Sequence, residues 1–214
     1  MKLHGKLIAL SVAGLFAVSA SAADLIVTYT GTVANGIDAD NMFGFGAGTD
    51  LTAKQFTLTF DYDTSDLEHV NPGYYDQYIG ASALSSVTLS LAGGTFASTI
   101  HSTYASTFRF QADPQEVVNY ILDDTSNSES YVDMTGTSVF ASIMLDTPLN
   151  YSFGPDSTQS AHFQVNGNRI TLTAAGLSSS VSTVPEAGSW VMMLAGFGAI
   201  GAMRRRESFV LSQG

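Results

Sequence analysis

The sequence predicts an all-β protein, with an antiparallel β-sandwich or jelly-roll-like body, an N-terminal signal helix and a short C-terminal transmembrane helix. Apolar and polar residues alternate along most of the chain, and turn residues separate the alternating segments at intervals of roughly ten residues. Long continuous apolar runs occur only near the two ends. The length of 214 residues fits a single domain.

The first element is a signal peptide at residues 1–22. A cationic start precedes an apolar run at 7–18, and Ala20 and Ala22 form a small-residue cleavage site. Such a run reaches only ~18 Å as a helix, whereas a hydrocarbon core is ~30 Å thick. We therefore expect signal peptidase to cut after Ala22; a retained first transmembrane helix is the alternative.

Residues 23–177 are expected to form the β-sandwich body. At 56–62, four aromatic or aliphatic residues alternate with polar ones, which is typical of a strand with one buried face. Gly93-Gly94 and Asn166-Gly167 indicate hairpin turns. The run 117–122, interrupted by Asn119, fits either a central strand or a short helix. Further strands are expected at 25–33, 87–91, 96–100, 108–110, 139–145, 163–165 and 170–172, and loops at 31–48 and 71–75.

The C-terminal part divides into three segments. A Ser-rich linker is expected at 178–184, a membrane segment at 185–206 and a cytoplasmic tail at 207–214. The apolar stretch is short for a membrane span, but a Trp before it and Arg residues after it extend its reach to the two interfaces. By the positive-inside rule the Arg cluster stays cytoplasmic, so residues 24–184 are expected outside the inner membrane.

The residues of this segment resemble the PEP-CTERM sorting signal, specifically the PEPxxWA variety of alphaproteobacteria. The resemblance implies a Gram-negative source, export by the general secretory route, transient anchoring in the inner membrane and recognition by an exosortase. It also implies removal of the tail during delivery to the cell envelope or the extracellular biofilm matrix. A plain C-terminal membrane anchor is the alternative. The motif residues are Pro185, Glu186, Trp190, Gly196, Gly198, Arg204, Arg205 and Arg206.

Composition limits the chemistry of the body. The absence of Cys excludes disulfides, thiolate metal sites and a cysteine nucleophile. The net charge of −11 argues against a nucleic-acid partner. No nucleophile elbow, P-loop or dinucleotide-binding motif occurs. His69, His101 and His162 have no metal-binding spacing, so each is expected to be a polar histidine of the surface or of a loop. We therefore predict no catalytic residue.

Two groups of residues are candidates for binding. Oxygen ligands at Asp61, Asp63, Asp66 and Glu68 resemble the start of a calcium loop, although Asp66 and Pro72 stand where that loop needs Gly and Glu. An acidic, solvent-exposed strand end is the alternative, and calcium is the one cofactor considered. The second group, which offers an aromatic platform for a sugar, is Tyr74, Tyr75 and Tyr78; packing in the core or at an interface is the alternative.

These observations lead to three hypotheses of function. The first is an exported, non-enzymatic structural or binding component of the cell envelope or extracellular matrix, with extracellular polysaccharide as a candidate partner. The second is a secreted carbohydrate-active enzyme that uses pairs of Asp and Glu, which requires a defined separation of two carboxylates across a sugar. The third is a calcium-stabilised adhesion module.

Overall fold

The computed structural model describes residues 23–111, 113–137, 139–154 and 157–183, and over these residues the protein is all-β and antiparallel. The expected signal peptide, membrane segment and cytoplasmic tail lie outside the described residues. Within the described part of the chain, no helix has the length and apolar character needed to cross a membrane.

The described chain contains fourteen strands and one short 3₁₀ helix, η1 (Ala39–Asn41). A separate two-stranded sheet consists of β2 (Ile37–Asp38) and β3 (Thr49–Asp50). The main sheet contains β1 (Ala23–Asn35), β4 (Gln55–Asp63), β5 (Glu68–Val70), β6 (Tyr75–Gly80), β7 (Ser86–Leu91), β8 (Ala97–His101), β9 (Tyr104–Phe110), β10 (Gln115–Asp123), β11 (Ser128–Gly136), β12 (Leu149–Ser152), β13 (Thr158–Val165) and β14 (Asn168–Thr183).

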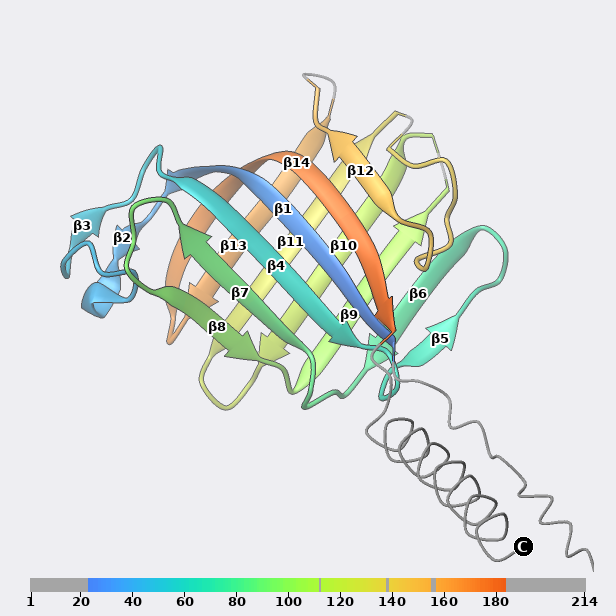
Figure 1. The fold of residues 1–214 in the computed structure, drawn as a ribbon, viewed down its shortest axis with the longest axis horizontal. Coiled ribbons are helices and arrows are strands. Elements are labelled where there is room, and N and C mark those ends of the chain that lie inside the picture. The colour runs from blue at the N-terminus through green and yellow to red at the C-terminus, as the bar shows by residue number, and fades with distance from the viewer. Residues whose placement is uncertain (1–22, 112, 138, 155–156, 184–214) are drawn as a thin grey trace, which may run out of the picture. The chain divides into compact units, whose positions relative to one another are not determined.

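The main sheet is continuous and curls into two layers, instead of consisting of two separate sheets. Its strand order is β5-β6-β9-β10-β11-β13-β14-β1-β4-β7-β8, and β12 pairs with β14. In Figure 1 the strands β14, β1, β4, β7 and β8 pass in front, and β13, β11, β10, β9 and β6 lie behind them. The long strand β14 joins the layers, because its first residues pair with β13 and its remainder pairs with β1 and β12.

The core fills the space between the layers. The alternation expected at 56–62 is confirmed in β4, where Phe56, Leu58, Phe60 and Tyr62 are buried. Phe60 stacks on Tyr62, with ring centroids 5.9 Å apart, and meets Tyr29 of β1 edge-on at 6.1 Å. Such aromatic pairs add to the free energy gained from apolar burial.

Two expected segments differ in the structure. The predicted Ser-rich linker is instead the end of β14, because β1 supplies a hydrogen-bonding partner as far as Thr183. The strand expected at 139–145 is absent, although Val139, Ile143 and Leu145 are buried. There, side chains of Gln115, Asp76 and Arg109 bind the backbone groups that a neighbouring strand would bind.

The loop expected at 31–48 is wrong over its first part, because β1 continues to Asn35 and β2 and η1 follow it. Other local predictions are confirmed. Residues 117–122 lie in β10, so they form a strand and not a helix. The hairpin between β13 and β14 turns at Asn166 and Gly167, which both have positive φ, and Gly93 lies in the connection between β7 and β8.

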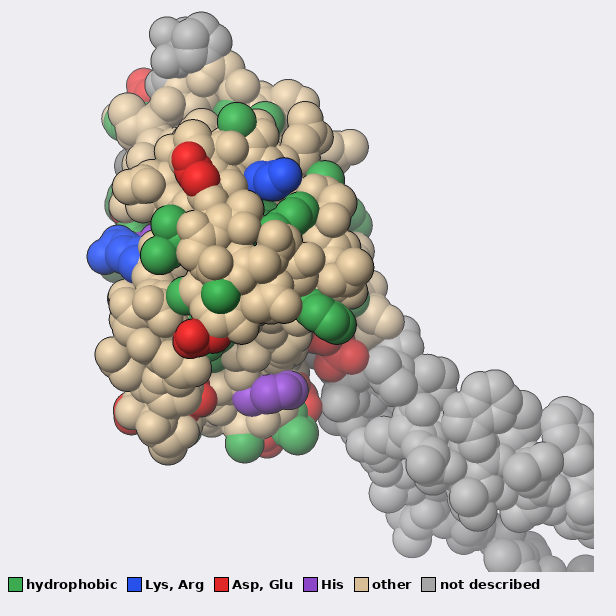
Figure 2. Space-filling view, turned by 90° about the vertical axis from the view of Figure 1, so that its left-hand side faces the viewer, with side chains coloured by type: hydrophobic (Ala, Val, Ile, Leu, Met, Phe, Trp, Pro, Cys, Tyr) green, Lys and Arg blue, Asp and Glu red, His purple; other side chains and the backbone are tan. Residues whose placement is uncertain are grey.

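Figure 2 shows the end of the β body that carries β2 and β3, where hydrophobic side chains are dispersed rather than gathered in one patch.

Candidate ligand-binding face

Strands β6, β9, β10, β11 and β13 present one continuous surface to solvent, which we call the outer face. Their inward positions, such as Thr107, Val117 and Val132, are buried in the core, whereas the alternate positions of β9, β10 and β11 are half-buried. The strand register aligns these outward positions in rows across the sheet. One row contains Tyr75, Phe110, Glu116, Thr135 and Thr158, and the next contains Gln77, Phe108, Val118, Asp133 and Ser160.

Aromatic rings cover the β6–β9 side of the outer face. Tyr74, which is 57% exposed, meets Tyr75 at 5.0 Å and Phe110 at 6.1 Å between ring centroids. Phe108 lies 5.5 Å from Tyr75 and stacks on Phe110 at 6.0 Å. Because each ring contacts its neighbours, the four form a fixed apolar surface.

A second line of rings crosses the strands β9 to β13. Tyr104 and Tyr120 lie 6.2 Å apart, Tyr120 and Tyr131 also 6.2 Å, and Tyr131 and His162 5.9 Å. The register explains this line, because Tyr120 is directly opposite Tyr131, and Tyr131 is directly opposite His162. Cross-strand aromatic pairs of this kind stabilise a sheet.

Near Tyr131 the outer face contains a depression of about 260 Å³ lined by polar side chains, which we call the polar hollow. The Tyr131 hydroxyl donates a hydrogen bond of 3.0 Å to the Asp133 carboxylate. Partial burial, this hydrogen bond and the charge of Asp133 raise the pKa of Tyr131 to about 12. The residues lining the hollow are Asp133, Thr135, Thr158, Gln159 and Ser160.

Glu116 adds a second carboxylate to this region. Burial first, and then the charge of Asp133, raise the pKa of Glu116 above its ordinary value. Glu116 is directly opposite Thr135, one row away from Asp133. The polar hollow and its border therefore combine carboxylate acceptors with hydroxyl groups that both donate and accept hydrogen bonds.

His162 is held in one tautomer at the end of the aromatic line. Arg169 lies 2.8 Å from its Nδ1, and Glu129 lies 3.0 Å from its Nε2. Because a guanidinium only donates, Nδ1 accepts, so the ring proton is on Nε2 and is donated to Glu129. Burial, assisted by the charge of Arg169, lowers the pKa of His162, and Glu129 opposes this effect. The ring is therefore buried and neutral, where a surface or loop histidine was expected.

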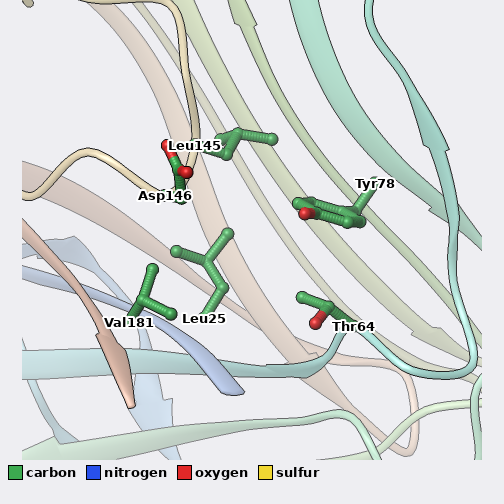
Figure 3. Close-up of a pocket in the computed structure, with 6 residues that line it drawn as sticks. All are labelled: Leu25, Thr64, Tyr78, Leu145, Asp146 and Val181. Carbon is green, nitrogen blue, oxygen red and sulfur yellow. The ribbon is translucent and has the colours of Figure 1, made fainter. Parts of the chain in front are cut away.

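The structure separates the three tyrosines that sequence analysis grouped. Tyr74 and Tyr75 belong to the outer face, but Tyr78 points to the opposite side of β6 and stacks on His69 at 4.4 Å. Figure 3 shows Tyr78 facing Leu25 and Leu145 across a cavity of about 60 Å³. The predicted grouping is therefore wrong for Tyr78. The rings that lie beside Tyr74 and Tyr75 are those of Phe108 and Phe110.

The carboxylates proposed as calcium ligands are distributed along the chain's path from β4 to β5. Asp61 and Asp63 lie on β4, Asp66 in the following turn and Glu68 on β5. Asp63 accepts a hydrogen bond of 2.9 Å from the Ser65 backbone N–H. In the described part of the chain, no group of three or more His, Asp or Glu side chains is arranged to hold a metal ion. The calcium hypothesis stays a prediction.

Burial and neighbouring carboxylates raise the pKa of two acidic groups near this strand end. Asp24 on β1 lies directly opposite Asp63 on β4. Burial first, and then the charge of Asp63, raise the pKa of Asp24. The pKa of Asp61 is raised by burial and by both of these neighbours. Negative charges therefore repel one another at this end of the two strands.

Several residues of the outer face gave no separate signal in the sequence. Glu116, Tyr120, Tyr131 and Asp133 occupy alternate positions of two strands. Alternation indicates which side of a strand a residue faces, but it does not indicate which strands are neighbours. Only the pairing of β11 with both β10 and β13 brings these side chains together with those of Thr158 and its neighbours.

Comparison with known proteins identifies one segment of the chain. Residues 183–206 match the PEP-CTERM protein-sorting motif, and the match contains every motif residue that the sequence predicted. The chain therefore carries this sorting motif, and the match begins at Thr183, the last residue of β14. Neither a search of curated proteins nor a search of solved structures finds a match.

Proposed function

We propose that this chain is an exported protein of the cell envelope or extracellular matrix, which an exosortase sorts and which acts as a non-enzymatic binding component. The observation that carries the proposal is the PEP-CTERM motif at residues 183–206. Signal peptidase removes residues 1–22, the C-terminal segment holds the chain transiently in the inner membrane, and the β body is released outside the cytoplasm.

The charge distribution supports this route. Residues 24–184 contain 17 acidic and three basic residues, which gives a net charge of −14. Such a charge keeps a protein soluble and disfavours anionic partners. The cations near the membrane segment are Arg204, Arg205 and Arg206, which favour the cytoplasmic side.

Deletion of residues 185–214 tests the role of the motif. The shortened protein is expected to appear soluble, without the membrane-bound precursor that the full chain forms. A matched control deletes only residues 207–214, which lie beyond the matched motif, and it should leave the precursor in the membrane fraction. Identical fractionation of all three forms, or cytoplasmic protein with both termini intact, would contradict the proposal.

Processing is tested by the mass of the mature protein. The change Trp190→Ala, combined with Ser at the positions of Arg204, Arg205 and Arg206, removes one interface anchor and the cationic stop. We expect the precursor to accumulate uncut, whereas the unaltered chain yields a product without its C-terminal segment. An unchanged mature mass in the variant would show that these residues are not recognised.

A second candidate function is a secreted carbohydrate-active enzyme. Glu116 and Asp133 favour it, because they interact electrostatically and the pKa of Glu116 is raised, as a general acid requires. Assays against a panel of polysaccharides compare the unaltered protein with Glu116→Gln and Asp133→Asn. Turnover that either change abolishes would replace the non-enzymatic proposal.

A further inference from the structure

We propose that the outer face binds an uncharged polysaccharide chain laid across strands β6 to β13. This inference rests on the proposed function and deepens it by naming the ligand class. The face extends over five neighbouring strands, and at ~4.8 Å between strands it spans ~19 Å. It therefore has room for several consecutive sugar rings.

The first argument is the mixture of side chains on the outer face. A sugar ring has apolar C–H faces and a rim of hydroxyl groups, so it is bound well by flat aromatic rings beside hydrogen-bonding groups. The rings of Tyr75, Phe108 and Phe110 contact one another at one side of the face. In the same two rows, Glu116 and Asp133 provide carboxylate acceptors on the adjoining strands.

The second argument is the polar hollow beside Tyr131. The carboxylate of Asp133 and the hydroxyl groups of Thr135, Thr158 and Ser160 line a volume of about 260 Å³ on the exposed side of the sheet. The amide of Gln159, the fifth lining residue, is bonded to the Ala174 backbone. Asp133 already orients the Tyr131 hydroxyl through a hydrogen bond of 3.0 Å. Sugar hydroxyls entering the hollow would meet the second oxygen of Asp133 and the side chains of Thr135, Thr158 and Ser160.

The third argument is charge. The outer face contains the carboxylates of Glu116, Glu129 and Asp133. The cation beside Glu129 and Gln164 in the strand register is Arg169 of β14, which is bound to His162. Carboxylates repel uronate, phosphate and sulfate groups but accept hydrogen bonds from neutral hydroxyls. The charge of the face therefore disfavours acidic polysaccharides and favours a neutral chain.

Affinity gel electrophoresis of the full-length chain in mild detergent tests the proposal. The probes are neutral polymers (hydroxyethyl cellulose, laminarin, dextran, galactomannan and soluble starch), with alginate as the acidic and chitosan as the cationic comparison. We expect retardation by at least one neutral polymer and none by alginate. The protein is extracted from whole cells, so the outcome does not depend on whether the chain is exported as proposed.

Substitutions then locate the binding site. Tyr131→Ala and Phe110→Ala should each weaken retention by about tenfold, the effect of losing ~1.4 kcal/mol of contact free energy. Asp133→Asn keeps the shape of the hollow and removes its charge, so a smaller loss is expected. The matched control is Phe96→Ala, because Phe96 is 59% exposed and lies outside the outer face. A cooperative unfolding transition above the assay temperature verifies that every variant is folded.

Four results would overturn the proposal. They are no retention by any neutral polymer, stronger retention by alginate than by the neutral polymers, equal loss in the Phe96→Ala control, and binding that none of the outer-face substitutions alters. Light scattering covers a further possibility. A dimer that Tyr131→Ala or Phe110→Ala converts to a monomer would show that a second copy, and not a polysaccharide, covers this face.

Discussion

Asn119 is a polar residue that connects both layers of the core. Its amide nitrogen donates to the Tyr29 hydroxyl at 2.6 Å, and its oxygen accepts from Tyr62 at 3.1 Å and Thr107 at 2.9 Å. These partners lie on β1, β4 and β9, whereas Asn119 lies on β10. Burial raises the pKa of both tyrosines, so their hydroxyls stay neutral. The Tyr62 hydroxyl also contacts the Ser106 backbone oxygen at 3.1 Å, whereas the hydroxyls of Tyr29 and Thr107 are bonded to this amide.

We expect Asn119→Leu to destabilise the protein by about 2–4 kcal/mol, because it leaves the buried hydroxyls of Tyr29 and Thr107 without this partner. Urea unfolding measures the change in the free energy of unfolding. Asn150→Leu is the control, since Asn150 is exposed on β12 and should tolerate the change. Equal effects of the two substitutions would show that the network contributes nothing specific.

His162 is expected to make stability depend on pH. The pKa of His162 is lower in the folded protein than in the unfolded chain. The stabilising contribution of this residue to the free energy of unfolding is therefore fully present above the unfolded pKa, near 6.5. It is lost as pH falls below that value, where the unfolded state binds more protons. The ring faces Glu129, Arg169 and Tyr131. His162→Gln should flatten the melting temperature between about pH 7.5 and pH 5.5.

The control for this pH effect is His101→Gln, because His101 is exposed on β8. It should retain the pH dependence of the unaltered protein. Carboxylates with raised pKa, such as Asp24, Asp61 and Glu116, act in the opposite direction at lower pH, because their protonation favours the folded state. The comparison between variants removes this common contribution, and parallel curves would refute the assignment to His162.

At the scale of elements, one buried arginine holds an irregular segment in place. Arg109, which is 2% exposed, donates hydrogen bonds to the backbone oxygens of Met144 at 2.7 Å and Thr147 at 3.0 Å, and to the Ser179 hydroxyl at 2.7 Å. Asp76, its neighbour across β6 and β9, accepts from the Leu145 backbone N–H at 2.7 Å. Together they attach the segment between β11 and β12 to the sheet.

Arg109→Met should therefore loosen this segment more than the rest of the sheet. The segment relies on side chains for its backbone hydrogen bonds, so we expect amide hydrogen exchange to accelerate at residues 143–148 while β1 and β4 stay protected. Arg169→Met is the control, because Arg169 is exposed and bonds to His162 instead. Uniform acceleration over the whole sheet would indicate global destabilisation and contradict the prediction.

The same segment shows where strand prediction fails. Local alternation identified β4, β7 and the hairpin of β13 and β14, because those strands have one buried and one exposed face. The same alternation of apolar and polar residues occurs at 139–145. There, however, the backbone forms hydrogen bonds with side chains that are distant in the sequence, and such bonds cannot be read from the local sequence. Conversely, the Ser-rich end of β14 contains few strand-forming residues and is held by its pairing with β1.

At the scale of the whole molecule, neighbouring strands are often distant in sequence. β6 lies beside β9, and β11 lies beside β13, so the rows of the outer face are composed of residues from separate parts of the chain. Sequence patterns predicted strands and identified Tyr74 and Tyr75, but the residues that complete the face depend on topology. The sorting motif, in contrast, was predictable because all its characteristic residues lie within one short segment of the sequence, 183–206.

The charge of the whole body leads to the last prediction. A net charge of −14 over residues 24–184 destabilises the compact state by self-repulsion, and Asp24, Asp61 and Asp63 add a local repulsion. Raising NaCl from about 0.02 M to about 0.5 M should therefore raise the melting temperature, because salt screens these interactions. Circular dichroism at a fixed pH measures the transition.

Calcium separates screening from a specific site in the same experiment. If the carboxylates act only by repulsion, CaCl₂ and MgCl₂ at matched ionic strength should raise the melting temperature equally. Asp61→Asn should then have a higher melting temperature than the unaltered protein without added salt.

The calcium hypothesis instead predicts an additional increase in the melting temperature with CaCl₂, because a ligand that binds only the folded state stabilises it. That increase should disappear in Asp61→Asn and Asp63→Asn and persist in Asp124→Asn, an exposed carboxylate elsewhere on the surface. A melting temperature that neither salt changes would contradict the repulsion argument itself.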